Sequence, residues 1–178
     1  MRMKRGCEME HEVREHKVVE QIPWRETCFG CNDGASEGVG MRAYVTGDGY
    51  VVGLCRAKTA HQGFPDTVHG GIIATYFDEV LWHATRVGDS ETIAMTVEIK
   101  VTYLRPVDIG QELRIVAEPA RAEGRHIHVD GFLLLEDGQT AAKASAHYIM
   151  LRPGNGLNQT ETCRVKHPQT SGPETVRF

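Results

Sequence analysis

The spacing of apolar residues along the chain changes several times, and each change predicts a different kind of secondary structure. Residues 41–57 form two short apolar stretches on either side of Gly47-Asp48-Gly49, as in a β-hairpin. Over residues 70–87 the apolar positions recur at helical spacing and form one broad face. Over residues 95–103 they alternate with polar positions, which predicts a long strand with one buried face.

Three more strands are expected after the long one. Arg105-Pro106 ends the long strand, because proline cannot donate a hydrogen bond to a neighbouring strand. The later strand-like segments are residues 112–117, 125–136 and 140–151, the last two separated by an Asp137-Gly138 turn. The expected order is two strands, one long helix and four strands. Its most economical packing is an α+β fold in which an antiparallel sheet packs on a single helix.

Composition divides the chain into three parts. Residues 1–27 form a charged N-terminal extension whose only helical pattern is weakly amphipathic. Residues 28–152 hold the expected helix and strands, and we assign them to one domain. Residues 153–178 are polar and contain several prolines and glycines, which predicts a mobile tail.

Bulk composition excludes several classes of protein. The chain has 178 residues, of which 40% are hydrophobic, so it can form a substantial core. A formal net charge of −4 argues against a dedicated nucleic-acid binder. No apolar run is long enough to cross a bilayer, and the N-terminus lacks the apolar stretch of a signal peptide. We therefore expect a cytoplasmic protein without a membrane partner, whose thiols stay reduced.

The five cysteines do not predict a disulfide framework, because their number is odd and their spacing scattered. Cys28-Phe29-Gly30-Cys31 is a CxxC pair. A zinc site would need two further ligands at paired spacing, and the chain has no second CxxC. We therefore expect a reduced turn here, and no metal site.

The segment from His69 to Asp78 carries the candidate chemistry. Gly70 and Gly71 begin the expected helix, where backbone N–H groups are free and the helix dipole is positive. Asp78 lies about two turns further along the same helix. Attack on a polarised carbonyl needs donors for the oxyanion together with a base or a nucleophile. This combination predicts an acyl-transfer enzyme.

The position of Asp78 on the helix has two interpretations. It lies on the arc opposite the apolar face, where a lone aspartate is usually solvated. Trp82 shares that arc, and an exposed tryptophan there would indicate an interface. Glu79 is a rival base, but His83 and Arg86 are close enough on the helix to favour a surface ion pair.

Helix geometry limits how Asp78 and Gly70 can act together. Asp78 follows Gly70 by eight residues. At about 1.5 Å of rise per residue, the two are roughly 12 Å apart on one helix. Because hydrogen bonds reach only about 3 Å, one helix cannot supply both groups to one carbonyl. If both groups act together, Asp78 must face Gly70 of another subunit, and a two-fold dimer would hold two equivalent sites.

The chain resembles the hotdog-fold acyl-CoA thioesterases, in the HGG…D branch that includes phenylacetyl-CoA-type thioesterases. The matching pieces are CFGCN at 28–32, HQG at 61–63, HGG at 69–71 with Asp78, MT at 95–96 and YLRPV at 103–107. The usual Asn-Pro of the first loop is replaced by Asp33-Gly34-Ala35-Ser36, which affects the shape of the loop rather than the chemistry. The resemblance implies a curved antiparallel sheet wrapped around one central helix. It also implies homodimers, often paired into tetramers, with active sites at the dimer interface.

The resemblance also implies roles for individual residues. Gly70 would polarise the carbonyl with the help of Gly71, and His69 would orient the thioester or the water. Asp78 would act as a general base or as a nucleophile, and the sequence does not separate these routes. Thr96 matches a hydroxyl that family members place near the attacking carboxylate; the alternative is a solvent-facing threonine.

Three further residues complete the expected substrate contacts. His61 would line the pocket entrance, and Arg105 would contact a phosphate of coenzyme A. An ordinary exposed arginine at the end of a strand fits Arg105 equally well. Glu79, the alternative carboxylate, is also expected to contact the substrate.

The predicted function is hydrolysis of an acyl-CoA to a free acid and coenzyme A by a homodimer or homotetramer. Coenzyme A is then part of the substrate, and no cofactor is expected. One alternative is a non-catalytic acyl-CoA-binding or regulatory hotdog protein. Another is a hotdog dehydratase, which would need a histidine and a carboxylate placed for proton abstraction.

Overall fold

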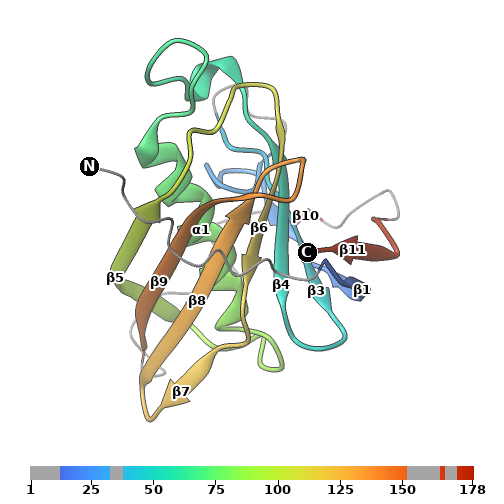
Figure 1. Cartoon of the computed structure of the whole chain (residues 1–178). Coiled ribbons are helices and arrows are strands. Elements are labelled where there is room, and N and C mark those ends of the chain that lie inside the picture. The colour runs from blue at the N-terminus through green and yellow to red at the C-terminus, as the bar shows by residue number, and fades with distance from the viewer. Residues whose placement is uncertain (1–12, 33–37, 152–164, 167–171) are drawn as a thin grey trace, which may run out of the picture.

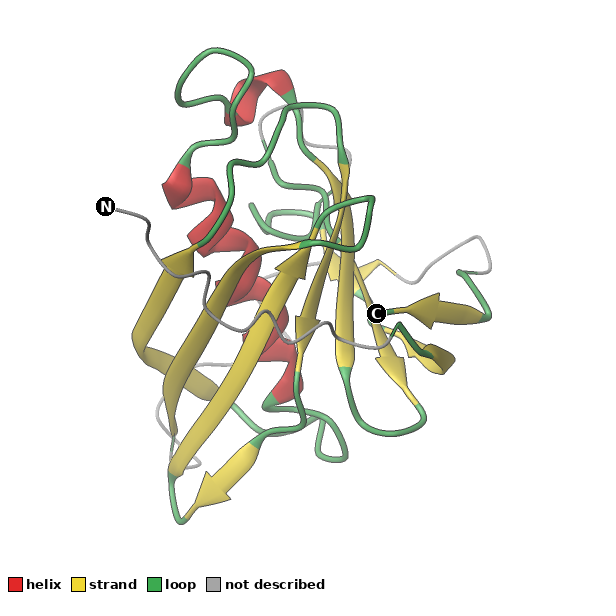
Figure 2. Cartoon of the chain, viewed as in Figure 1, coloured by secondary structure: helices red, strands yellow, loops and turns green. Residues whose placement is uncertain are grey.

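A curved antiparallel sheet packed on one α-helix makes up the fold of the computed structural model (Figures 1 and 2). The structure describes residues 13–32, 38–151, 165–166 and 172–178. The expected α+β hotdog architecture is confirmed. Among the described residues, no helix has the length and apolar character needed to pass through a membrane.

The main sheet runs in the order β11-β1-β3-β4-β6-β8-β9-β5, with β7 paired to β8. All of its pairings are antiparallel. Its strands are β1 (Glu15–Gln21), β3 (Arg42–Thr46), β4 (Val51–Arg56), β5 (Ala94–Tyr103), β6 (Glu112–Ala117), β7 (Arg121–Glu123), β8 (His126–Leu134), β9 (Thr140–Met150) and β11 (Thr175–Arg177). Two short strands, β2 (Trp24–Arg25) and β10 (Val165–Lys166), pair with each other. A 3₁₀ turn, η1, spans Thr59–His61.

The central helix is α1 (Gly70–Ala84), close to the expected span. Its apolar side chains are buried against the sheet, as their spacing predicts: Ile73, Tyr76, Phe77, Val80, Leu81 and Ala84. The sheet accommodates the helix through small residues. A Cβ atom at Gly131 of β8 would lie 2.7 Å from a Leu81 methyl carbon, so only glycine permits this approach.

The start of α1 is fixed by a side-chain cap. His69 is the N-cap residue, and its Nδ1 accepts a 2.9 Å hydrogen bond from the Gly71 N–H. The backbone N–H groups of Ile72 and Ile73 donate to the His69 carbonyl oxygen. The cap therefore satisfies donors that the first turn of a helix would otherwise leave open.

The long strand β5 differs from expectation. Its apolar residues were predicted to form a buried face, but Met95, Val97 and Tyr103 are each more than half exposed. β5 lies at one edge of the sheet (Figure 1), and its pairing with β9 is irregular between Thr96 and Glu98. Ile99 and Val101 of the same strand are partly buried against the core, so the expected apolar face is covered only in part.

Both chain ends also differ from expectation. Part of the extension 1–27 forms strands β1 and β2 instead of a helix, and part of the predicted mobile tail 153–178 forms β11 beside β1. Phe178 is buried, and its ring stacks on the His16 ring with centroids 3.9 Å apart. Because β1 and β11 belong to the main sheet, the sheet extends beyond the domain bounds 28–152. Residues 1–12, 153–164 and 167–171 of these two segments lie outside the described part of the chain.

Replacing Phe178 by alanine should destabilise the fold, because Phe178 closes a small apolar cluster with Val52, Val116 and Phe132. We expect a loss of about 3 kcal/mol in the free energy of unfolding, measured by chemical denaturation. Val19→Ala, at a position that is 61% exposed, should change it by less than about 0.5 kcal/mol. Equal effects of the two substitutions would show that the C-terminal strand does not dock in solution.

Replacing His69 tests the helix cap. His69→Ala should lower the free energy of unfolding by about 1 kcal/mol, whereas His69→Asn should cost only a few tenths, because asparagine is a good N-cap residue. Thermal and chemical denaturation of both variants would measure this. If asparagine is no better than alanine, the histidine ring contributes to stability by some means other than capping.

Candidate active site

The first turn of α1 presents one open backbone donor. The Gly71 N–H is already bonded to His69, so it is not available to a ligand in this conformation. Within the described segments, the Gly70 N–H has no recorded acceptor. The Tyr103 hydroxyl donates a 2.8 Å hydrogen bond to the Gly70 carbonyl oxygen, which ties β5 to the start of the helix. An electronegative atom placed here would therefore meet the Gly70 N–H and the positive end of the helix dipole.

The carboxylate of Asp78 is exposed and bonded to β5. The Thr96 hydroxyl donates a 2.9 Å hydrogen bond to Asp78 Oδ1. The two residues also line one cavity of about 520 Å³. The structure therefore brings Thr96 and Asp78 together, as the resemblance implies, and orients one carboxylate oxygen while the other remains available.

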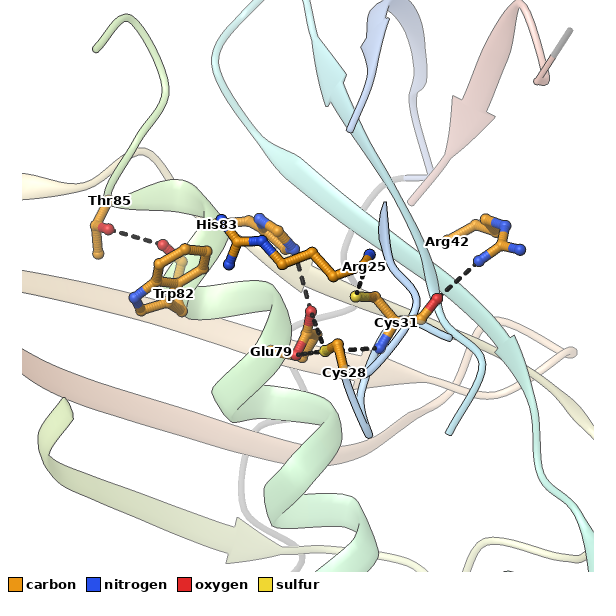
Figure 3. Close-up of polar contacts among 8 residues, drawn as sticks. All are labelled: Arg25, Cys28, Cys31, Arg42, Glu79, Trp82, His83 and Thr85. Carbon is orange, nitrogen blue, oxygen red and sulfur yellow. Dashed lines mark hydrogen bonds and ion pairs between the residues drawn. The ribbon is translucent and has the colours of Figure 1, made fainter. Parts of the chain in front are cut away.

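Glu79 points to a different side of the helix from Asp78 and lies in a small polar cluster (Figure 3). Its Oε1 is 3.2 Å from His83 Nε2, and its Oε2 is 3.7 Å from Cys28 Sγ. The expected pairing with His83 is present but does not lie on the surface. The Glu79 side chain is only 17% exposed and the His83 side chain only 9% exposed. Burial opposes ionisation of Glu79, but hydrogen bonds from His83 and the two cysteines outweigh it and lower the pKa of Glu79.

The CxxC turn presents both of its sulfur atoms to this cluster. The backbone N–H of Cys31 donates to Cys28 Sγ at 3.3 Å, and that of Arg25 donates to Cys31 Sγ at 3.4 Å. The Cys31 thiol also donates to the Cys28 sulfur, which lowers the pKa of Cys28 to about 7 and raises the pKa of Cys31. Both thiols are free. The turn is reduced, as expected, but it faces a carboxylate that the linear sequence places 48 residues beyond Cys31.

Trp82 was expected to be an exposed interface residue and is instead half-buried. Its indole N–H donates a 2.8 Å hydrogen bond to the Ala94 carbonyl oxygen, which anchors the helix to the first residue of β5. The guanidinium of Arg86 lies 5.1 Å from the indole ring centre. Arg86 therefore stacks on Trp82, and no ion pair with Glu79 is recorded for it. Trp82 lines the same cavity as Asp78.

His61 and Arg105 occupy less accessible positions than expected. His61 is only 1% exposed, so it lies in the core rather than at a pocket entrance. Its Nδ1 lies 3.1 Å from the Tyr76 hydroxyl oxygen, and burial lowers the pKa of His61. Arg105 is half-buried and donates a 2.8 Å hydrogen bond to the Thr140 carbonyl oxygen. A phosphate contact by Arg105 stays a prediction.

The candidate site therefore consists of two separate halves on one chain. One half is the open Gly70 N–H, and the other is the Asp78–Thr96 pair in the cavity. Two turns of helix, roughly 12 Å, separate them. Sequence reasoning missed the bond from Tyr103 to Gly70 and the cluster around Glu79. For the cluster, the i, i+4 spacing of Glu79 and His83 was an available signal. For the Tyr103 contact the sequence holds no comparable signal.

Comparison with known proteins finds similarity to thioesterases in the region around these halves. A model of the thioesterase superfamily matches residues 66–142, which include α1 and β5. The chain is 32% identical over 97 residues to acyl-coenzyme A thioesterase THEM4 from Mus musculus. That match covers 54% of this chain and 41% of the mouse protein, so the chain spans less than half the length of that relative.

Solved structures share the fold. The Escherichia coli PaaI protein, from the phenylacetic acid degradation operon, has a TM-score of 0.57 at 18% identity, covering 68% of this chain and 86% of its own. A hypothetical thioesterase from Streptococcus pneumoniae, solved with coenzyme A, has a TM-score of 0.52 at 21% identity, covering 58% and 80%. These likenesses show the hotdog fold, and the match at residues 66–142 relates that part of the chain, less than half of it, to the thioesterase superfamily.

Proposed function

We propose that this protein is an acyl-CoA thioesterase, working as a homodimer in which Asp78 of one subunit faces Gly70 of its neighbour. The observation that carries the proposal is an open N–H donor at the start of α1 together with Asp78, two turns along the same helix and held by Thr96 of β5. Support comes from the family match and from the similarity to mouse acyl-coenzyme A thioesterase THEM4. The neighbour solved with coenzyme A supports the class of substrate.

The proposed reaction uses each half of the site for one task. The thioester carbonyl oxygen accepts a hydrogen bond from the Gly70 N–H, which stabilises the negative charge that develops during attack. Asp78 either takes a proton from the attacking water or attacks the carbonyl carbon itself to form an anhydride that water then opens. The C–S bond breaks, and the products are a free acid and coenzyme A. Coenzyme A enters as part of the substrate, so these steps need no separate cofactor.

Strand β5 supports the proposed dimer. It is the last strand at its edge of the sheet, and such an edge offers free backbone hydrogen-bonding groups to another chain. It also exposes Met95, Val97 and Tyr103, an apolar stripe that a partner would cover. Thr96 and Tyr103 of this strand contact Asp78 and Gly70 respectively. A second copy docked on β5 would therefore lie next to both halves of the site.

The cavity beside Asp78 is suited to part of the substrate. Its volume of about 520 Å³ falls in the range of small-molecule pockets. Trp82, Ala94 and Met95 contribute apolar wall next to the carboxylate. We propose that the acyl group occupies this cavity, with its thioester carbonyl directed toward the partner's helix start.

Replacing Asp78 by asparagine tests the chemistry. Asp78→Asn should reduce kcat by at least about 100-fold, because asparagine is neither a base nor a nucleophile. Thr96→Val should cost about tenfold, since the hydroxyl only orients the carboxylate. Release of free thiol from a panel of acyl-CoAs measures both effects. Glu98→Gln is the matched control, an exposed carboxylate two residues from Thr96, and should keep full activity.

Binding measurements on the same variants separate the rival functions. Asp78→Asn should still bind a non-hydrolysable acyl-CoA thioether. Tight binding by the unmutated protein without thiol release would identify a binding or regulatory protein instead. Hydration of an enoyl-CoA without thiol release would identify a dehydratase.

A subunit-mixing experiment tests the shared site. Gly70→Pro removes the proposed donor while suiting the first helical position, and the extended backbone of His69 suits a following proline. Each variant alone should lose at least about 100-fold in kcat. In a two-fold dimer, a mixed pair of Asp78→Asn and Gly70→Pro subunits regains one intact site of two. With half of the dimers mixed, a co-refolded equimolar sample should recover about a quarter of the original activity.

Two other outcomes of the subunit-mixing experiment would contradict the shared site. No recovery, with both variants folded and mixed dimers present, would show that Asp78 and Gly70 do not complete one site across the dimer. A fully active monomer would exclude the shared site altogether.

A further inference from the structure

We propose that Cys28, Cys31 and Glu79 form a zinc site in which His83 is placed to supply the fourth ligand. In the described part of the chain, this is the group of histidine, cysteine and acidic side chains whose ligand atoms gather closely enough for a metal ion. The proposal rests on side chains that the proposed hydrolysis does not use. It departs from the expectation that the missing second CxxC rules out a metal, because the fold brings the other ligands from α1.

The distances suit a tetrahedral site. The two sulfur atoms and a carboxylate oxygen all lie within 4.8 Å of one another. Around a zinc ion the sulfur and oxygen ligands would be roughly 3.6 Å apart, and the nitrogen and oxygen ligands roughly 3.4 Å. Measured to the same carboxylate oxygen, Glu79 Oε1, the distances are 3.9 Å from Cys28 Sγ and 3.2 Å from His83 Nε2. His83 lies outside the group of three whose ligand atoms fall within 4.8 Å of one another, so its ring would have to move toward the sulfur atoms to complete the site.

The charges of these groups favour a cation between them. Two thiolates and one carboxylate would repel each other in a half-buried site, and a divalent ion neutralises most of that repulsion. Soft sulfur ligands together with nitrogen and oxygen donors suit zinc better than calcium or magnesium. Both sulfur atoms accept backbone N–H groups, which stabilise the thiolate form that binds metal.

The scaffold holds the ligands on two elements that face each other (Figure 3). Glu79 and His83 are one helical turn apart on α1, so both side chains project to the same side. The CxxC turn lies against them through Gly30. A Cβ atom at Gly30 would lie 2.6 Å from the Glu79 carboxyl carbon, so glycine leaves room for the Glu79 side chain in the position it takes here. A bound ion would fasten the 28–31 turn to the central helix.

The role inferred for the ion is structural. Asp78 and Thr96 are not among the ligands, although they line the same cavity as Cys28, Cys31 and Glu79. A site with four protein ligands keeps no open position for a substrate. Removing the ion should therefore lower stability more than it changes the chemical step.

The first test measures zinc in the full-length protein. Purified protein should contain one zinc ion per chain by elemental analysis, and a chelating dye should compete for it. Replacement by Co²⁺ should give the visible absorption of a tetrahedral site with sulfur ligands. Chelator treatment should lower the melting temperature, and added Zn²⁺ should restore it. Absence of zinc, of Co²⁺ absorption and of any stabilisation by Zn²⁺ would overturn the proposal.

Variants identify the ligands. Cys28→Ser, Cys31→Ser and Glu79→Gln should each weaken zinc affinity at least about tenfold, and His83→Ala by about 10–100-fold. The control replaces the other three cysteines, as Cys7→Ser, Cys55→Ala and Cys163→Ser, and should keep the ion. Loss of zinc in the control, with retention in the ligand variants, would place the metal elsewhere. The zinc and Co²⁺ measurements on the unmutated protein still test the proposal if a variant fails to fold.

The oxidation state of Cys28 and Cys31 provides a further test of the zinc site. If non-reduced protein contains a Cys28–Cys31 disulfide and takes up no zinc after reduction, the pair is a redox couple and the proposal fails. These readouts are independent of thioester hydrolysis. A zinc-containing protein without hydrolytic activity would contradict the proposed function alone, and an active protein without zinc would contradict only the metal site.

Discussion

The rigidity of α1 is the constraint on which the whole arrangement depends. The helix fixes the separation between its open N-terminal donor and Asp78, and no side-chain rotation can bring the two together. Its position is fixed in turn by the buried face from Ile73 to Ala84, by the close approach at Gly131 and by the His69 cap. A site that needs both groups must therefore be completed by another helix of the same kind.

Strand β5 links this constraint to the edge of the sheet. Thr96, near one end of the strand, orients Asp78, and Tyr103, at the other end, binds the carbonyl of Gly70. The pairing irregularity between Thr96 and Glu98 locally redirects the strand where the threonine meets the helix. Because β5 is also the exposed edge, any partner that docks on it would act on both halves of the site together.

The sequence predicted the parts of the fold that follow from strong local patterns. The helix from Gly70, the hairpin around residues 47–49 and the strands β6, β8 and β9 all have clear periodicity or turn residues. Strands β1 and β11 were missed because they carry few apolar residues, and they are ordered by pairing with each other across the whole length of the chain. Periodicity reveals that β5 alternates apolar and polar residues, but not that Ile99 and Val101 pack on the core while Met95 and Val97 are exposed.

The candidate site could be predicted only where its residues lie close in sequence. The HGG…D segment occupies one helix, so its geometry follows from helical rise alone. The burial of His61 against Tyr76, the anchoring of Trp82 and the meeting of the CxxC turn with Glu79 are all tertiary contacts. No spacing rule encodes them, since each depends on which loop or strand the fold places beside the helix.

The adjacent acidic residues Asp78 and Glu79 of α1 have different surroundings, and we infer a different role for each. Consecutive residues project about 100° apart around a helix, so Asp78 and Glu79 face different surroundings. Asp78 meets the hydroxyl of β5 and open space, which suits a group that must reach a substrate. Glu79 meets His83 and the two cysteines in a half-buried corner, which suits a group that holds a structural contact. Fastening the 28–31 turn at Glu79 would steady the helix turn that carries Asp78, so stability at one acid supports precise placement of the other.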